Sequence, residues 1–134
     1  MKENTVNSKT RRIVGWVLTI LAILFLLFDG IGKIIQPAPV VEATQQLGFA
    51  SNQIGTIGII LLICTIIYAI PSFSVLGAVL LTGFLGGAIA IQFKAGNPLF
   101  SHTLFPLYIA AFVWGGLVLR TDILKRVFSL NRVS

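Results

Sequence analysis

Charged side chains are scarce in this chain of 134 residues, because only 10% of them are Asp, Glu, Lys or Arg, compared with about 25% in an ordinary soluble domain. Ten of these fourteen residues lie in residues 1–12 or 120–134. A soluble domain does not leave the 107 residues between them almost free of charge. A disordered chain needs more charge and less hydrophobicity. The sequence therefore excludes both classes and predicts a membrane protein.

Cysteine and histidine each occur once, as Cys64 and His102. A single cysteine forms neither a disulfide nor a Cys-x-x-Cys redox pair within the chain. A single histidine cannot supply both axial ligands of a bis-histidine haem, and no acidic pair lies near it to complete a metal site. No catalytic motif is present, so these absences favour a protein that is not an enzyme and holds no metal.

Long apolar runs are abundant instead. A helix crosses a bilayer core about 30 Å thick with roughly 20 apolar residues, and four runs meet this requirement: residues 13–35, 54–70, 74–93 and 98–119. The first run is too long for the apolar part of a signal peptide, and no small-residue cleavage site follows it. The sequence predicts an all-α integral membrane four-helix bundle that forms a single domain over residues 1–134.

The links between these runs are short. Residues 71–73 join the second run to the third, so these two helices must be antiparallel neighbours. The longest link, residues 36–53, has Pro39 at a suitable place for a helix start and Gly48 for a helix end. We expect a short helix there, lying at the membrane interface.

Positive residues are distributed unevenly between the two sides of such a bundle. If the N-terminus is cytoplasmic, the segments on that side carry eight Lys and Arg residues, whereas the outer links carry Lys33 and Lys94. The positive-inside rule therefore predicts that both termini are cytoplasmic. Because the basic residues flank membrane spans, the expected partner is the lipid bilayer and not nucleic acid.

Three features predict how the bundle meets the inner surface and packs. Trp16, Tyr68 and Trp114 fall near the inner boundary, as an aromatic belt does. The tail from residue 120 combines apolar with basic residues and is expected to lie along the inner surface. Small residues four apart in the third run predict close helix contacts: Ala78, Thr82, Gly86 and Ala90, with the pair Gly83 and Gly87 beside them.

One layer near the outer face gathers polar side chains from separate spans. At about 1.5 Å per residue, Asp29 lies roughly 24 Å above Ile13, and Lys33 lies one turn higher. Asp29 and Lys33 are four residues apart, so they share a helix face and can pair. The third and fourth spans bring their own polar residues to the same level. The candidate ligand-binding residues are Asp29, Lys33, Gln92, Lys94 and His102.

This layer has two interpretations. In the first, the charged pair holds the outer end of the bundle together, Lys94 extends to the interface, and His102 caps a helix start. In the second, the layer is a ligand or proton site, as is common for ionisable groups inside a membrane. Pro106 supports the second interpretation, because it has no N–H to donate and so leaves the carbonyl oxygen of His102 available.

Three segments carry a resemblance to a known family: FDGIGKIIQPAPVVEATQQLGF from residue 28, PSFSVLGAVLLTGFLGGAIA from residue 71, and GNPLFSHTLFPLY from residue 96. The chain resembles the DoxX-like family of small bacterial membrane proteins. The resemblance includes Gly30 and Lys33 near the end of the first span. It implies a four-helix bundle in the inner membrane, and it implies quinone-linked redox or stress-response complexes as the surroundings, since the family is named after a subunit of a thiosulfate:quinone oxidoreductase.

These observations lead to two hypotheses for function. The first is a non-catalytic accessory or anchor subunit with a small outer-facing pocket, whose partner is a redox-enzyme subunit or a second copy of the chain. In that pocket His102 and Lys33 would hydrogen-bond a quinone-like carbonyl or a small anion, with Asp29 setting their charge. The alternative is a small transporter or proton-conducting protein in which Asp29 and His102 exchange protons. A membrane chaperone or assembly factor would leave no residue-level signature.

The orientation can be tested with reporter fusions. A fusion after Arg120 should be active only with a cytoplasmic reporter, and a fusion within residues 45–53 only with a periplasmic one, because the positive residues hold both termini inside. A C-terminal fusion that is active only with the periplasmic reporter would contradict both the orientation and the depth of the polar layer.

Overall fold

The computed structural model describes residues 2–121, and every regular element in that part of the chain is helical. Four segments of it are long and apolar enough to cross a membrane, so the protein is an all-α, multi-pass membrane protein, as predicted. The elements are α1 (Lys2–Ile35), α2 (Ala38–Gln46), α3 (Ser51–Ala69), the 3-10 turn η1 (Pro71–Phe73), α4 (Ser74–Lys94), the π-helical turn η2 (Leu99–Thr103) and α5 (Phe105–Arg120).

Two of the boundaries that differ from the predicted spans have a local cause. Helix α3 begins at Ser51, three residues before the predicted start, because the side-chain oxygen of Gln53 accepts a hydrogen bond from the N–H of Ala50 and stabilises the first turn. The fourth span, predicted as one helix over residues 98–119, is divided into η2 and α5. Pro106 lies in the first turn of α5, where its missing N–H does no harm, so the helix restarts there instead of continuing through.

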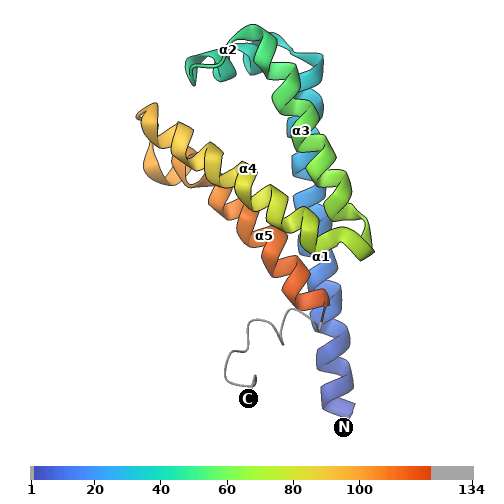
Figure 1. Cartoon of the computed structure of the whole chain (residues 1–134). Coiled ribbons are helices and arrows are strands. Elements are labelled where there is room, and N and C mark those ends of the chain that lie inside the picture. The colour runs from blue at the N-terminus through green and yellow to red at the C-terminus, as the bar shows by residue number, and fades with distance from the viewer. Residues whose placement is uncertain (1, 122–134) are drawn as a thin grey trace, which may run out of the picture.

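The spanning helices converge at one end of the molecule and separate toward the other (Figure 1). Helices α1 and α3 run side by side, and α4 and α5 form a second pair that leans away from them toward the end where α2 lies. We call this end the α2 end and the opposite one the Arg120 end. The start of α1 and the end of α5 both lie at the Arg120 end, which agrees with an even number of spans. Which membrane face this is stays a prediction.

Large apolar side chains are divided between the core and the outer surface. The core contains at least one fully buried residue from each spanning helix, including Leu26, Leu61, Leu81 and Val113. Other apolar side chains point outward, such as Phe28, of which 80% is exposed. Soluble monomers rarely expose apolar patches of this extent. These outward faces therefore contact the lipid bilayer.

Glycines bring α1 close to two of its neighbours. A Cβ added at Gly116 in α5 would lie 2.9 Å from the carbonyl oxygen of Gly15, and one added at Gly58 in α3 would lie 2.8 Å from that of Gly30. Both distances are shorter than real Cβ contacts, so only glycine permits these approaches. Helix α1 is therefore the common partner of α3 and α5.

The small residues of α4 were predicted to allow close helix contacts, but most of them do not lie at such a contact. Ala78 is buried in the core, but a Cβ added at Gly83, Gly86 or Gly87 would meet no atom of another element within 4 Å. The prediction of close packing is wrong at these glycines within a single chain, because α4 leans away from α1 and α3 over its second half (Figure 1). Those glycines face open space instead.

The link between the first two spans contains the expected short helix, α2. Pro37 is its N-cap, Pro39 lies in its first turn, and Gly48 has φ +97° just beyond its C-cap, a conformation that glycine adopts without strain. The prediction of a short helix is confirmed, and its position at the membrane interface stays a prediction. The basic tail, predicted to lie along the inner surface, falls outside the described residues beyond residue 121.

The close approach of α1 and α5 can be tested with two matched substitutions. Gly116→Ala should lower the free energy of unfolding by about 1–3 kcal/mol, as overpacking does, because its Cβ would meet the backbone of Gly15 and Thr19. Gly86→Ala should be neutral or stabilise by up to about 1 kcal/mol, since alanine favours a helix. Melting temperatures in detergent would check both. Equal melting temperatures for the two variants would contradict this packing.

Candidate functional site

A cavity of about 540 Å³ lies between the diverging helices at the α2 end. Residues from α1, α2, α3, α4, η2 and α5 line it. Most of the lining is apolar, and it includes the aromatic rings of Phe25, Phe49, Phe84 and Phe105. The rings of Phe25 and Phe105 contact each other, with centroids 5.2 Å apart. Gly83 and Gly87 also line the cavity, so the open space beside the α4 glycines is part of it.

The charged groups of the cavity come from α1. Lys33 Nζ donates a hydrogen bond to Asp29 Oδ1 at 2.5 Å, four residues away on the same helix face. The Lys33 side chain is 17% exposed and that of Asp29 is 38% exposed. The predicted pairing is therefore confirmed, and it leaves both groups accessible from the cavity.

The remaining predicted polar groups come from α4 and η2. Gln92 accepts a hydrogen bond from Asn97 through its side-chain oxygen, and the donor side of its amide bonds no group among residues 2–121. His102 contacts the Ser101 hydroxyl through Nδ1 at 2.8 Å, so its Nε2 is the ring nitrogen left for a ligand. Both side chains line the cavity.

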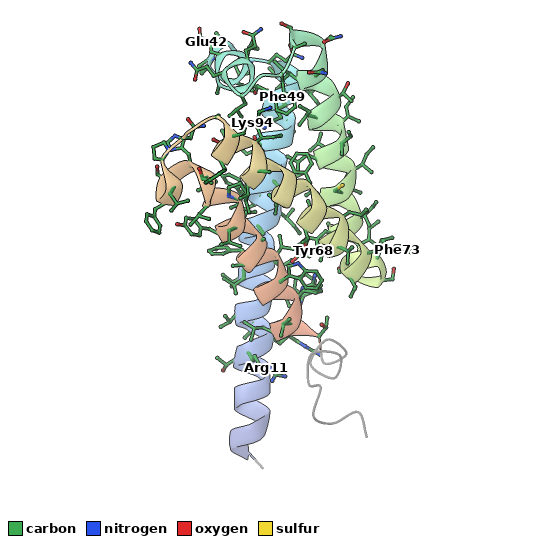
Figure 2. The ribbon with its side chains drawn as sticks, turned by 60° about the vertical axis from the view of Figure 1, so that its left-hand side comes forward. Arg11, Glu42, Phe49, Tyr68, Phe73 and Lys94 are labelled. Atoms are coloured by element: carbon green, nitrogen blue, oxygen red, sulfur yellow. The ribbon has the colours of Figure 1, made fainter. Side chains whose placement is uncertain are left out.

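Four of the five predicted residues therefore line one cavity, and Lys94 does not. Lys94 is exposed at the end of α4, close to the α2 end of the molecule (Figure 2). It lies two residues beyond Gln92, which rotates its side chain by about 200° around the helix axis. The two residues were predicted to lie in one site because they have similar depths in the membrane. Their side chains point in different directions around the helix, so only Gln92 lines the cavity. That the four lining residues bind a ligand stays a prediction.

A second polar cluster, at the Arg120 end, was missed in the sequence. Arg120 is only 9% exposed. Its Nε donates to Thr19 Oγ1 at 3.0 Å, and its Nη2 donates to Ser74 Oγ at 3.2 Å. The guanidinium carbon also lies 4.4 Å from the centre of the Trp16 ring, within the range of a cation–π contact. One side chain of α5 thus contacts α1 and α4.

Tyr68 of α3 completes this cluster. Its hydroxyl donates to the carbonyl oxygen of Val113 at 2.7 Å, and its own carbonyl oxygen accepts from Ser74 Oγ at 2.8 Å. It is fully buried, and its side chain extends from α3 to α5 (Figure 2). The prediction that Tyr68 belongs to an aromatic belt is therefore wrong, because its hydroxyl finds protein partners instead of lipid headgroups.

A sequence signal for this cluster existed. Thr19 lies about 9 Å above Ile13, whereas Tyr68, Ser74 and Arg120 lie within about 3 Å of the inner ends of their spans. A long arginine side chain that turns inward can reach hydroxyls from all three of the other spans. We assigned Tyr68 and Arg120 to the membrane surface because residues of these types are common at span ends. Their burial follows from how the helices converge.

No group of three or more His, Cys, Asp or Glu side chains suited to a metal ion occurs within residues 2–121. In the comparison with known families, the model of the DoxX-like family matches residues 17–116. Neither the curated proteins nor the solved structures contain a match. The matched segment includes the cavity at the α2 end, and it includes Thr19, Tyr68 and Ser74 of the second cluster but not Trp16 or Arg120.

Two tyrosines provide a matched test of the Arg120 cluster. Tyr68→Phe should lower the free energy of unfolding by about 1–2 kcal/mol, because it removes a fully buried hydrogen bond. Tyr108→Phe removes the bond to the Phe100 carbonyl oxygen at a residue that is 42% exposed, so its effect should be smaller. Unfolding in detergent would measure both. If Tyr108→Phe is as destabilising as Tyr68→Phe, the cluster does not hold the bundle together.

Proposed function

Because the chain belongs to the DoxX-like family, we propose that it is a non-catalytic accessory protein of the bacterial inner membrane that binds a small membrane-soluble molecule. The ligand has an apolar body and a polar head with hydrogen-bond acceptors, as a quinone does. The cavity at the α2 end is the binding site. The complex that the protein serves is a quinone-linked redox or stress-response enzyme.

The single observation that carries this proposal is the distribution of chemistry in the cavity. Its volume of about 540 Å³ lies in the usual range of ligand sites, about 300–1,000 Å³. Apolar and aromatic side chains make up most of the wall. The wall has few polar side chains, among them Asp29, Lys33, Gln92 and His102. A planar ring with carbonyl groups and an apolar tail matches such a wall.

The polar groups supply donors for a carbonyl oxygen. Lys33 Nζ has further protons besides the one it gives to Asp29, Gln92 offers its amide nitrogen, and His102 offers Nε2 in one tautomer. These donors come from α1, α4 and η2, so a bound head group would bridge the two separated helix pairs. Binding would then stabilise the α2 end of the protein.

The accessory role follows from what surrounds the cavity. The outward faces of the spanning helices are apolar, so the protein meets its partner within the lipid. That partner is a redox-enzyme subunit, or a second copy of the chain. Purification in a mild detergent should recover one of them together with a bound quinone.

The proton-conducting alternative has one observation in its favour, since Asp29 and His102 line the same cavity. The Arg120 cluster weighs against it. A proton or cation leaving the cavity would have to pass the converged end of the bundle, where the buried guanidinium of Arg120 repels positive charge. Binding without passage therefore has more support than conduction.

Blocking the cavity from the α4 wall tests the binding site. Gly87→Phe should weaken binding of ubiquinone-1 at least ten-fold, about 1.4 kcal/mol, because Gly87 lines the cavity with open space at its Cβ position, so that an added ring would occupy the cavity. Gly86→Phe is the matched control, since Gly86 has the same open surroundings but does not line the cavity. Calorimetric titration in lipid nanodiscs would measure binding, with melting temperatures showing that both variants fold. Failure of the wild-type protein to bind, or equal binding by Gly87→Phe, would refute the proposed site.

A further inference from the structure

The cavity carries no net formal charge from its carboxyl and amino groups. Within the described part of the chain, the lining contains one acidic residue, Asp29, and one basic residue of the Lys or Arg type, Lys33. Glu42 on α2 and Lys94 at the end of α4 lie outside the lining (Figure 2). The pair sums to zero wherever the proton between the two groups resides.

Lys33 is held where Asp29 neutralises it. Its Nζ lies 2.5 Å from Asp29 Oδ1, and its stem is close to α3, since a Cβ added at Gly58 would lie 2.8 Å from Lys33 Cβ. The backbone of α1 fixes the other end of the pair at four residues' distance. An entering molecule therefore meets a lysine that already has a carboxylate partner.

We infer that Asp29 is a specificity-determining residue, which makes this cavity select uncharged carbonyl compounds over carboxylates of the same size. The inference rests on the proposed function, because it concerns the same cavity. A carboxylate would lose its hydration on entering the apolar wall and would come close to the like charge of Asp29. Lys33 would not compensate, since its charge is already engaged. An amide, ester or quinone carbonyl has no charge, so it neither loses the hydration of an ion nor is repelled by Asp29. It still accepts hydrogen bonds from Lys33, Gln92 or His102.

The selectivity should follow the charge of the pair and not its shape. Asp29→Asn preserves the size of the side chain but leaves Lys33 as a cation without its carboxylate. The cavity should then favour a carboxylate. Adding Lys33→Met removes that cation while keeping a long unbranched side chain, and the preference for an uncharged ligand should return. Lys33→Met alone leaves Asp29 and should favour an ammonium group.

The experiment compares decanamide with decanoate, which share one chain and differ in charge. Binding is measured in nanodiscs at pH 8, with empty nanodiscs as the blank and melting temperatures as the check on folding. The wild-type protein should bind decanamide at least ten-fold more tightly than decanoate. Asp29→Asn should bind decanoate at least ten-fold more tightly than the wild type does, and the double variant should lose that gain.

Glu42→Gln is the matched control, because it removes a carboxylate that does not line the cavity and should leave the selectivity unchanged. If Asp29→Asn does not fold, a gain of decylammonium binding in Lys33→Met tests the same charge. The inference is overturned if the wild type binds the two probes equally, if neither single variant gains its charged probe, or if Glu42→Gln alters selectivity as much as Asp29→Asn. Its failure is separate from that of the proposed function, which depends on ubiquinone-1 binding and on Gly87→Phe.

Discussion

The contacts of Arg120 are the interaction on which the arrangement of the helices depends. This buried guanidinium bonds hydroxyls of α1 and α4, while Tyr68 joins α3 to α5 beside it. In lipid, a buried polar group must find its partners within the protein, so these four helices are held at one end. Gly15 and Gly116 allow α1 and α5 to approach there. The α4–α5 pair separates from α1 and α3 toward the other end (Figure 1), and the cavity lies there between the spanning helices.

The two polar regions of the protein therefore have different consequences. At the Arg120 end, hydroxyls and aromatic rings surround the cation and draw the helices together. At the α2 end, Asp29 and Lys33 satisfy each other on a single helix, so they need no partner on α4 or α5 and do not close the gap. Because the Asp29–Lys33 pair needs no partner on another helix, space for a ligand remains beside it. Arg120 instead bonds groups on two other helices, and this brings the helices together.

The sequence determined which residues cross the membrane and which reach the same depth. Four apolar runs, the short helix beginning near Pro39 and the spacing of Asp29 and Lys33 are local properties of the chain, and the structure contains all three. Span length, helix start signals and contacts between residues four apart act within one segment. The polar layer was therefore recognisable, together with four of the residues that line the cavity: Asp29, Lys33, Gln92 and His102.

Rotation and tilt of the helices were decided only by the tertiary structure. Depth placed Lys94 beside Gln92, but α4 is rotated so that only Gln92 lines the cavity. The stripe of Gly83, Gly86 and Gly87 predicted a contact, but α4 leans away and leaves it open. Arg120 has the composition of a surface anchor and becomes buried because three other helices meet it. A sequence pattern defines the faces of each helix, whereas the direction each face points depends on packing against neighbours that are distant in the chain.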